Sequence, residues 1–96
     1  MLPVVWLEGA DADLAAITAY ISERNPQAAD RLWSRIRASV VGLSQFPYMY
    51  RVSDRVPGLR EMVVQSNDIV LYRVTESRVE IVKVASARQH FPHTRR

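Results

Sequence analysis

Residues 57–84 read PGLREMVVQSNDIVLYRVTESRVEIVKV and contain three short apolar runs, Met62–Val64, Ile69–Val74 and Val79–Val84. These runs are rich in β-branched and aromatic residues, which favour a pleated, half-buried strand. The polar segments between them, residues 66–68 and 75–78, are too short to hold a crossover helix. The three strands are therefore expected to pair antiparallel, as a meander.

A first helix is predicted upstream of these strands. Leu14, Ile17 and Ile21 lie three and four residues apart, so they share one face of a helix. Asp11 or Asp13 is expected to cap its start, because an Asp carboxylate accepts the unpaired amide protons there and complements the helix dipole.

A second helix follows directly. The pair Asn25-Pro26 ends the first helix, because a residue before Pro is pushed out of the α region, and then supplies the N-cap and first position of the second. The second helix is predicted to reach about Ser44, with an apolar face formed by Ala29, Leu32, Trp33, Ile36, Val40 and Leu43. Since only a capped turn separates the two helices, they are expected to form an antiparallel hairpin.

The N-terminal segment Pro3–Leu7 is apolar and is predicted to form a short strand. The order β-α-α-β-β-β then predicts a two-layer α+β domain, in which the helical hairpin covers a small sheet. The first strand is expected to join that sheet, and the sequence leaves open whether it lies at an edge or in the centre. With no internal repeat, residues 1–96 are predicted to be a single domain.

Composition excludes several classes of protein. Hydrophobic residues make up 48% of the chain and only 3 residues are Gly, as in a folded globule. The absence of Cys removes disulfides, thiol catalysis and thiolate metal sites. No run approaches the ~20 apolar residues of a membrane span, and the N-terminus lacks the pattern of a signal peptide. We expect a cytoplasmic protein without a membrane partner, a metal or a cofactor.

The formal charge of +3 is unevenly distributed along the chain. Residues 1–48 carry four Arg and five acidic residues, whereas residues 49–96 carry nine basic and five acidic residues. Positive potential is therefore expected on the half of the molecule that holds the sheet. Twelve of the 13 basic residues are Arg, whose planar guanidinium pairs with either carboxylate or phosphate. Composition does not choose between an acidic protein and a nucleic acid as partner.

Arg60, Arg73 and Arg88 lie in or beside the predicted strands. One interpretation makes them a phosphate-binding set on the exposed face of the sheet. The other makes them solvent-facing residues paired with nearby Glu residues. The second is favoured for Arg73, because alternation along a half-buried strand already requires a polar residue there. Both interpretations stay open for Arg60 and Arg88.

His90 and His93 lie three residues apart. Pro92 interrupts the helix that would bring two such side chains to one metal, and no third ligand lies nearby, so a metal site is not expected. His90 is a candidate general base if Arg60 and Arg88 converge on it.

The remaining candidates are aromatic residues and helical arginines. Residues 48–50, Tyr-Met-Tyr, are expected to fold over the open end of the core, and base stacking is the alternative. Trp6 and Trp33 are interpreted as core or interface anchors. Arg31 and Arg35 lie four residues apart and are expected on a solvated face of the second helix.

Short motifs then resemble a known family over nearly the whole chain. They are Ala12–Ile17 with Tyr20 and Ile21, Asn25–Ala29, Leu43–Pro47, Pro57–Glu61, Leu71–Val74 and Ala87–Pro92. In this order they resemble the RelE/ParE superfamily of toxins from bacterial type II toxin–antitoxin modules, and most closely its ParE branch.

The resemblance to the ParE branch implies a toxin that binds a cellular protein, DNA gyrase, and carries no catalytic residues. It also implies a cognate antitoxin, through which alone the toxin would reach operator DNA. A disordered antitoxin segment is expected to fold across the helical hairpin and a sheet edge. Its candidate contacts are Trp6, Leu14, Tyr20, Arg31, Trp33 and Arg35. The candidate contacts of the target are Arg60, Arg73 and Arg88.

The RelE branch, whose members cleave mRNA on the ribosome, implies an alternative ribonuclease set of Arg60, Arg88 and His90. The chain departs from that branch at several positions. Ile69 stands where RelE uses a catalytic Arg, and the terminal Tyr of RelE falls near Thr94. The helical lysines of RelE have no counterpart, because Lys83 is the only Lys.

Two further points stay open from the sequence. An inactive toxin, retained as an antitoxin-binding co-repressor, is a third possible function. Ser86 stands where many ParE relatives have His, so the role of this position is not defined.

Overall fold

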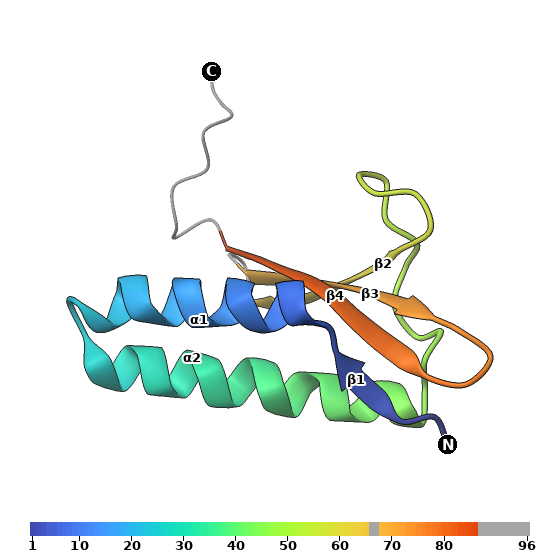
Figure 1. Ribbon diagram of the computed structural model, residues 1–96, viewed down its shortest axis with the longest axis horizontal. Helices are drawn as coiled ribbons and strands as arrows, with labels where there is room; N and C mark the ends of the chain where they lie inside the picture. The colour runs from blue at the N-terminus through green and yellow to red at the C-terminus, as the bar shows by residue number, and fades with distance from the viewer. Residues whose placement is uncertain (66–67, 87–96) are drawn as a thin grey trace.

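The computed structural model describes residues 1–65 and 68–86. The elements are β1 (Val4–Trp6), α1 (Glu8–Ser22), α2 (Pro26–Ser39), a 3-10 helix η1 (Val40–Ser44), β2 (Arg60–Gln65), β3 (Asp68–Val74) and β4 (Val79–Ser86) (Figure 1). The predicted order of elements and the α+β class are confirmed.

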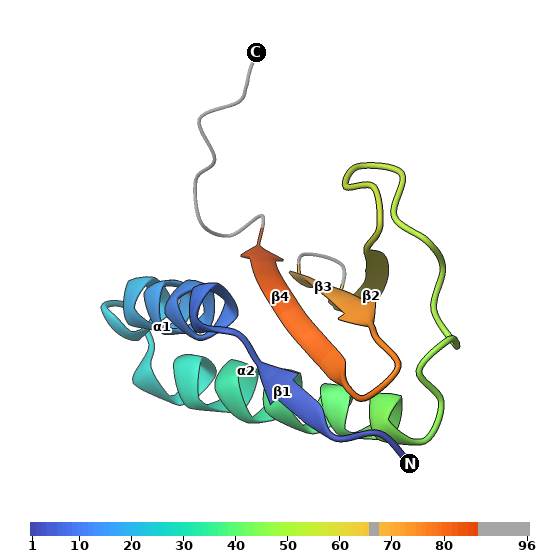
Figure 2. The same ribbon diagram turned by 45° about the vertical axis from the view of Figure 1, so that its right-hand side comes forward.

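The strands form one sheet in the order β1-β4-β3-β2 (Figure 2). β2 pairs antiparallel with β3, and β3 with β4, which confirms the meander. β1 lies at the edge and runs parallel to β4, with Val4 opposite Val79 and Trp6 opposite Ile81. The structure thus answers the question that the sequence left open about the first strand.

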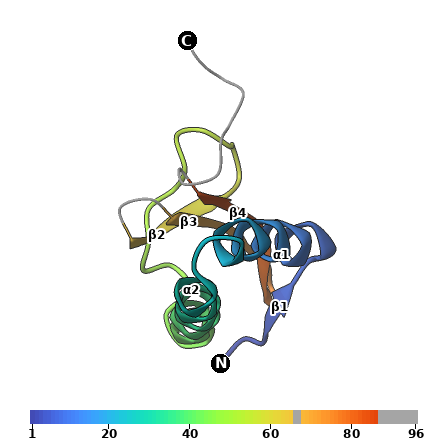
Figure 3. The ribbon, with the colours of Figure 1, turned by 90° about the vertical axis from the view of Figure 1, so that its left-hand side faces the viewer.

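The helical hairpin covers one face of this sheet (Figure 3). Buried side chains from both layers form one core: Ala10, Leu14, Ile17, Leu32, Ile36, Val40, Leu43, Met62, Val70, Tyr72, Val79, Ile81 and Val84. In β3 the alternate residues Val70 and Tyr72 enter this core, as expected for a sheet covered on one face, and the partly buried Val4 and Trp6 of β1 pack against it. The other face of the sheet carries charged side chains such as Arg73 together with the apolar Val63 and Leu71, and no helix of the described residues covers it.

The start of α1 differs from the expectation. The helix begins at Glu8, and Leu7 occupies the N-cap position without a side-chain cap. Asp13 instead accepts a hydrogen bond from the backbone N–H of Val84, at 3.0 Å. Because β1 is only three residues long, β4 is unpaired beyond Ile81 on its β1 side, and the Asp13 carboxylate satisfies a donor of that open edge. The prediction of an Asp cap was wrong.

The turn between the helices is as predicted. The Asn25 side chain accepts a hydrogen bond from the N–H of Ala28, at 3.0 Å, and Pro26 is the first residue of α2. The helical path reaches Ser44 as expected, although its last turns tighten into η1. Trp33 does not belong to the buried face, because 45% of it is exposed. Neither helix, nor any other in the described residues, is long and apolar enough to cross a bilayer.

The linker between η1 and β2 is held in place by polar contacts. Gly58, with φ of 84°, follows Pro57 in a turn closed by a hydrogen bond from the N–H of Leu59 to the carbonyl of Val56, at 3.2 Å. Tyr50 packs against the core, whereas Tyr48 and Met49 are 65% and 66% exposed. The prediction that all three residues cover the core was therefore correct for Tyr50 alone.

Candidate functional site

A stack of aromatic and guanidinium groups lies where β1 meets α2. The Cζ of Arg37 is 4.1 Å from the ring centroid of Trp6 and 4.8 Å from that of Trp33. Arg37 Nη2 also donates a hydrogen bond to Asp11 Oδ1, at 2.9 Å. We refer to Trp6, Arg37 and Trp33 as the Trp–Arg stack. It joins the sheet edge to both helices and leaves part of Trp33 exposed.

Sequence reasoning missed Arg37 as a member of this site. Trp33 and Arg37 lie four residues apart on one helix, a spacing that places side chains in contact. That signal was present in the sequence, but the approach of Trp6 from β1 was not. Cation–π contacts with two rings bury much of the guanidinium, and its Nε has no hydrogen-bond partner in the described residues.

A groove of about 340 Å³ runs along the outer face of the helical hairpin beside this stack. We call it the hairpin groove. It is lined by Ala15, Thr18, Ala19, Ser22, Ala29, Asp30 and Trp33. Small side chains between two helices and a partly exposed Trp form a surface that accepts apolar side chains of a partner.

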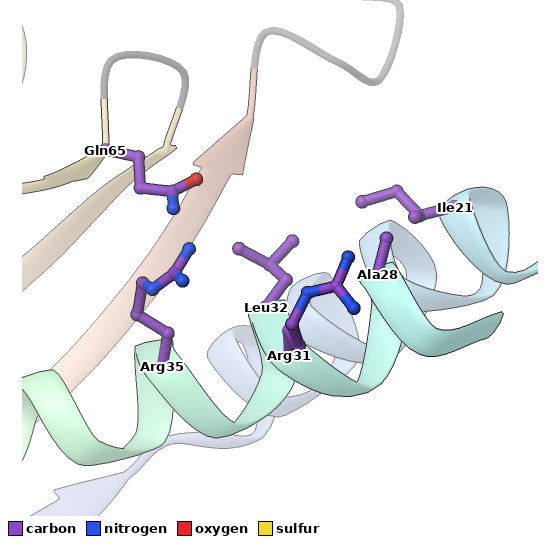
Figure 4. Close-up of a pocket in the computed structure, with 6 residues that line it drawn as sticks. All are labelled: Ile21, Ala28, Arg31, Leu32, Arg35 and Gln65. Atoms are coloured by element: carbon purple, nitrogen blue, oxygen red, sulfur yellow. The ribbon is translucent and has the colours of Figure 1, made fainter. Parts of the chain in front are cut away.

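A second hollow, of about 180 Å³, lies on the opposite flank of α2. It is lined by Ile21, Ala28, Arg31, Leu32, Arg35 and Gln65, and we call it the arginine pocket (Figure 4). Side chains two positions apart on an α-helix point to nearly opposite sides. Arg31 and Arg35 consequently lie on the flank of α2 that lines the arginine pocket, whereas Trp33 and Arg37 lie on the flank that forms the Trp–Arg stack.

The predicted antitoxin contacts therefore fall into separate groups. Trp6 and Trp33 come together through Arg37, and Arg31 and Arg35 line the arginine pocket. Tyr20 is 38% exposed on α1, under the guanidinium of Arg24. Leu14 is 0% exposed and lies in the core, so its assignment as a contact residue was wrong. The same apolar stripe that forms α1 uses Leu14 to hold the helix on the sheet.

Arg73 is engaged by an acidic partner on the uncovered face of the sheet. Its Nε donates to Glu80 Oε1 at 2.8 Å, and Arg78 Nε donates to Glu80 Oε2 at 2.8 Å. Hydrogen bonds from Arg73, and then from Arg78, hold the pKa of Glu80 below its usual value. The favoured interpretation of Arg73, a solvent-facing residue paired with Glu, is confirmed.

Arg60 makes different contacts. Its Nη1 donates to the carbonyl oxygen of Tyr50 at 2.7 Å, and its Cζ lies 5.0 Å from the ring centroid of Tyr48. Arg60 is opposite Tyr72 in the β2–β3 ladder, so these two side chains share a face of the sheet. Arg73 follows Tyr72 along β3 and points to the other face. Arg60 and Arg73 therefore do not form one phosphate-binding set.

Two buried side chains fix the linker to the sheet. Glu61 accepts hydrogen bonds from Ser53 Oγ, at 2.7 Å, and Arg51 Nη2, at 2.9 Å. These bonds, the one from Ser53 being the stronger cause, hold the pKa of Glu61 below its usual value. Burial raises the pKa of Tyr72, whose hydroxyl donates to the carbonyl of Pro47 at 3.0 Å.

Several predicted residues are not placed by the structure. Arg88, His90, His93 and Thr94 lie outside the described residues. Ser86 is buried and stands opposite Asp68 in the β3–β4 ladder. In residues 1–65 and 68–86, no three His, Asp or Glu side chains are grouped so that they could hold a metal ion.

Comparison with known proteins identifies similar sequences. A family model described as the ParE toxin of a type II toxin–antitoxin system, parDE, matches residues 4–91. Toxin RelE2 of Caulobacter vibrioides is 36% identical over 87 residues, which cover 91% of this chain and 97% of that protein. Putative toxin Y4kP of Sinorhizobium fredii is 34% identical over 88 residues, with 91% and 90% covered.

Solved structures show the same architecture. A chain of the chromosomal ParDE TA system from P. aeruginosa superposes with a TM-score of 0.80 at 26% identity, covering 90% of this chain and 96% of that one. The YoeB/ParE toxin from Agrobacterium tumefaciens superposes with a TM-score of 0.61 at 15% identity, covering 94% and 100%. The second likeness concerns the fold alone.

Proposed function

The chain belongs to the ParE toxin family of type II toxin–antitoxin systems, and from that membership we propose that it acts by binding a cellular protein. DNA gyrase is the target that the ParE branch implies. In this proposal the toxin catalyses no reaction, and a cognate antitoxin neutralises it by covering the helical hairpin.

The contacts of Arg60 support binding rather than RNA cleavage. RelE-type cleavage depends on basic residues that hold the scissile phosphate. Arg60, the one described residue of the alternative ribonuclease set, already donates to the carbonyl oxygen of Tyr50. Ile69 takes the β3 position where the RelE branch uses an Arg.

The target is proposed to contact the uncovered face of the sheet. Arg73 keeps 48% of its side chain exposed although it is paired with Glu80, so a partner can reach it. Arg60 points to the opposite face, beside the exposed ring of Tyr48, so a target that contacts both residues would have to reach around the β2 edge of the sheet. Arg88, which lies outside the described residues, is the third residue of the proposed target-binding set.

A supercoiling assay with purified toxin and purified gyrase tests the target. We expect micromolar toxin to inhibit supercoiling. Arg73→Ala should weaken that inhibition about tenfold, because it removes a positive charge from the proposed interface with the target. Glu76→Gln, an exposed change in the β3–β4 turn, is the matched control and should leave inhibition unchanged. Unchanged supercoiling with folded wild-type toxin would remove gyrase as the target.

The antitoxin is proposed to place apolar side chains in the hairpin groove, against Trp33. The groove lies beside the Trp–Arg stack, which holds Trp33 in a fixed orientation. A partly exposed, well-supported Trp is the usual kind of residue that dominates an interface. Trp33→Ala should weaken binding of the antitoxin at least tenfold, whereas Val41→Ala, an exposed change in η1, should not. Equal affinities for both variants would place the antitoxin elsewhere.

Ribonuclease activity is the alternative, because a relative at 36% identity carries the name Toxin RelE2. In this case Arg60, Arg88 and His90 would hold and cleave RNA. Induction in cells would then produce cleaved transcripts, and Arg88→Ala would abolish the cleavage. Intact transcripts together with arrested growth would exclude this alternative.

A further inference from the structure

We propose that the arginine pocket binds a carboxylate group, the side chain of a Glu or Asp on an acidic segment of a partner protein. The proposal rests on the proposed function in one respect, since the antitoxin is the expected source of that segment. The hairpin groove takes apolar side chains in that function, and the arginine pocket adds a separate, charged contact on the other flank of α2.

The pocket is shaped by both layers of the molecule. Figure 4 shows the guanidinium groups of Arg31 and Arg35 on either side of Leu32: that of Arg35 points toward Gln65 at the end of β2, and that of Arg31 lies beside Ala28. The β2–β3 register shifts between Val63 and Gln65. In a regular strand, consecutive side chains point to opposite faces, so Gln65 would point away from the helices if Val64 packs on the core. The β-bulge changes the direction of the side chains that follow it, and Gln65 therefore also faces α2.

The two guanidinium groups have no acidic partner. Neither the Arg31 nor the Arg35 guanidinium makes an ion pair or a hydrogen bond within residues 1–65 and 68–86; the one side-chain bond at these positions runs from the Ser39 hydroxyl to the backbone carbonyl of Arg35. They lie four residues apart, so their positive charges repel each other and weaken α2. The other cations of the described sheet and linker are largely paired, as Arg51 is with Glu61 and Lys83 with Asp13. An anionic group in the pocket would relieve the repulsion between Arg31 and Arg35.

The walls favour a carboxylate on an aliphatic stem over a free phosphate. Leu32 is buried at the base of the pocket, and Ile21 and Ala28 add apolar surface beside it. The methylene groups of a Glu side chain would cover this surface, while its carboxylate would accept paired hydrogen bonds from a guanidinium. A volume of about 180 Å³ suits one side chain, because an engineered cavity of roughly 150 Å³ holds a benzene molecule. A phosphate group has no apolar part to cover Leu32.

In the test, the full chain is titrated with blocked dipeptides, and binding is monitored through the Nε–Hε NMR signals of its Arg residues. Ac-Leu-Glu-NH2 should saturate the signals of Arg31 and Arg35, and Ac-Leu-Gln-NH2 should bind at least tenfold more weakly. The double variant Arg31→Ala/Arg35→Ala should lose binding without losing its fold, since Ala favours a helix. Arg31→Lys/Arg35→Lys should bind several-fold more weakly than wild type, because Lys keeps the charge but not the planar fork. Arg24→Ala, which lies outside the pocket, should bind as wild type does.

Three outcomes would overturn the proposal. Equal binding of the Glu and Gln dipeptides would show an apolar pocket without anion selectivity. Tenfold tighter binding of inorganic phosphate than of Ac-Leu-Glu-NH2 would show a phosphoryl site. Signals that do not saturate with any probe would show that the two arginines form no site. Growth arrest on induction tests the toxin function separately, so failure of either conclusion leaves the other measurable.

Discussion

At the scale of single residues, the described basic side chains divide into paired and unpaired groups. Arg73 and Arg78 share Glu80, and Arg51 binds Glu61. These pairs connect neighbouring strands, or the linker with β2, so they organise the sheet half of the molecule. The positive charge that the sequence concentrates there is largely used within the fold.

The contribution of these contacts to stability can be tested at Ser53. Its hydroxyl donates to Glu61 and accepts hydrogen bonds from the N–H groups of Arg55 and Val56, both at 3.1 Å. We expect Ser53→Ala to lower the free energy of unfolding by about 1–3 kcal/mol, because it leaves buried polar groups without a partner. Chemical denaturation measures this loss. Ser34→Ala on the exposed side of α2 should change stability by less than about 0.5 kcal/mol.

The hydrogen-bonded carboxylates of Glu61 and Glu80 predict how the stability of the fold depends on pH. The pKa values of Glu61 and Glu80 are lowered in the folded state, so their stabilisation is present above the unfolded pKa, about 4.3, and is lost as pH falls through the folded values. We expect the melting temperature to fall progressively below about pH 5. Glu61→Gln and Glu80→Gln should each melt lower at pH 7 and show a flatter acid dependence. A wild-type slope retained in both variants would contradict this explanation.

At the scale of elements, the turn between α1 and α2 depends on one side chain. Asn25 caps α2, and Pro26 fixes the first backbone angle of the helix. Asn25→Ala should lower the free energy of unfolding by about 0.5–2 kcal/mol, whereas Asn25→Asp should retain most of it. Thermal and urea denaturation measure both. Gln27→Ala is the control in the same turn, and a loss equal to that of Asn25→Ala would show that the cap is not the cause.

The Trp–Arg stack joins β1 to α2. Arg37→Ala should destabilise the fold by about 1–2 kcal/mol, because it removes cation–π contacts with two rings and an ion pair with Asp11. Arg35→Ala removes an Arg from the same helix that has no such partners, so it should not destabilise. Tryptophan fluorescence during denaturation reports the change directly at Trp6 and Trp33. Equal stability of the two variants would show that the stack contributes nothing measurable.

At the scale of the whole molecule, the formal charge of +3 should influence how fast an acidic partner arrives. Unpaired cations at an interface raise the association rate, and salt screens this effect. We expect association with an acidic antitoxin to slow about tenfold between 50 and 500 mM salt, measured by surface plasmon resonance. Arg31→Ala/Arg35→Ala should flatten this dependence, and Trp33→Ala should mainly speed dissociation. Salt-independent association of wild type would contradict the role of charge.

The sequence by itself determined the local elements and their order. Asn25-Pro26 defines the helical hairpin, and Pro57-Gly58 with three β-branched runs defines the meander, because turn chemistry and side-chain periodicity act over a few residues. It also determined the family, through motifs distributed over the whole chain. Pairing of Arg73 with a Glu was predictable for the same reason, since strand alternation places it on the polar face.

Only the tertiary structure decided which of these residues come together. The edge position of β1, the ring of Trp6 against Arg37, and the approach of Gln65 to Arg31 and Arg35 all join segments far apart in the chain. Strand register decided the rest, because a shift of one residue turns a side chain to the other face of a sheet. Arg60 and Arg73 are separated in this way, and the bulge before Gln65 builds the arginine pocket. Neither register nor bulge can be read from composition or periodicity, since both depend on how the strands pack against the helical hairpin.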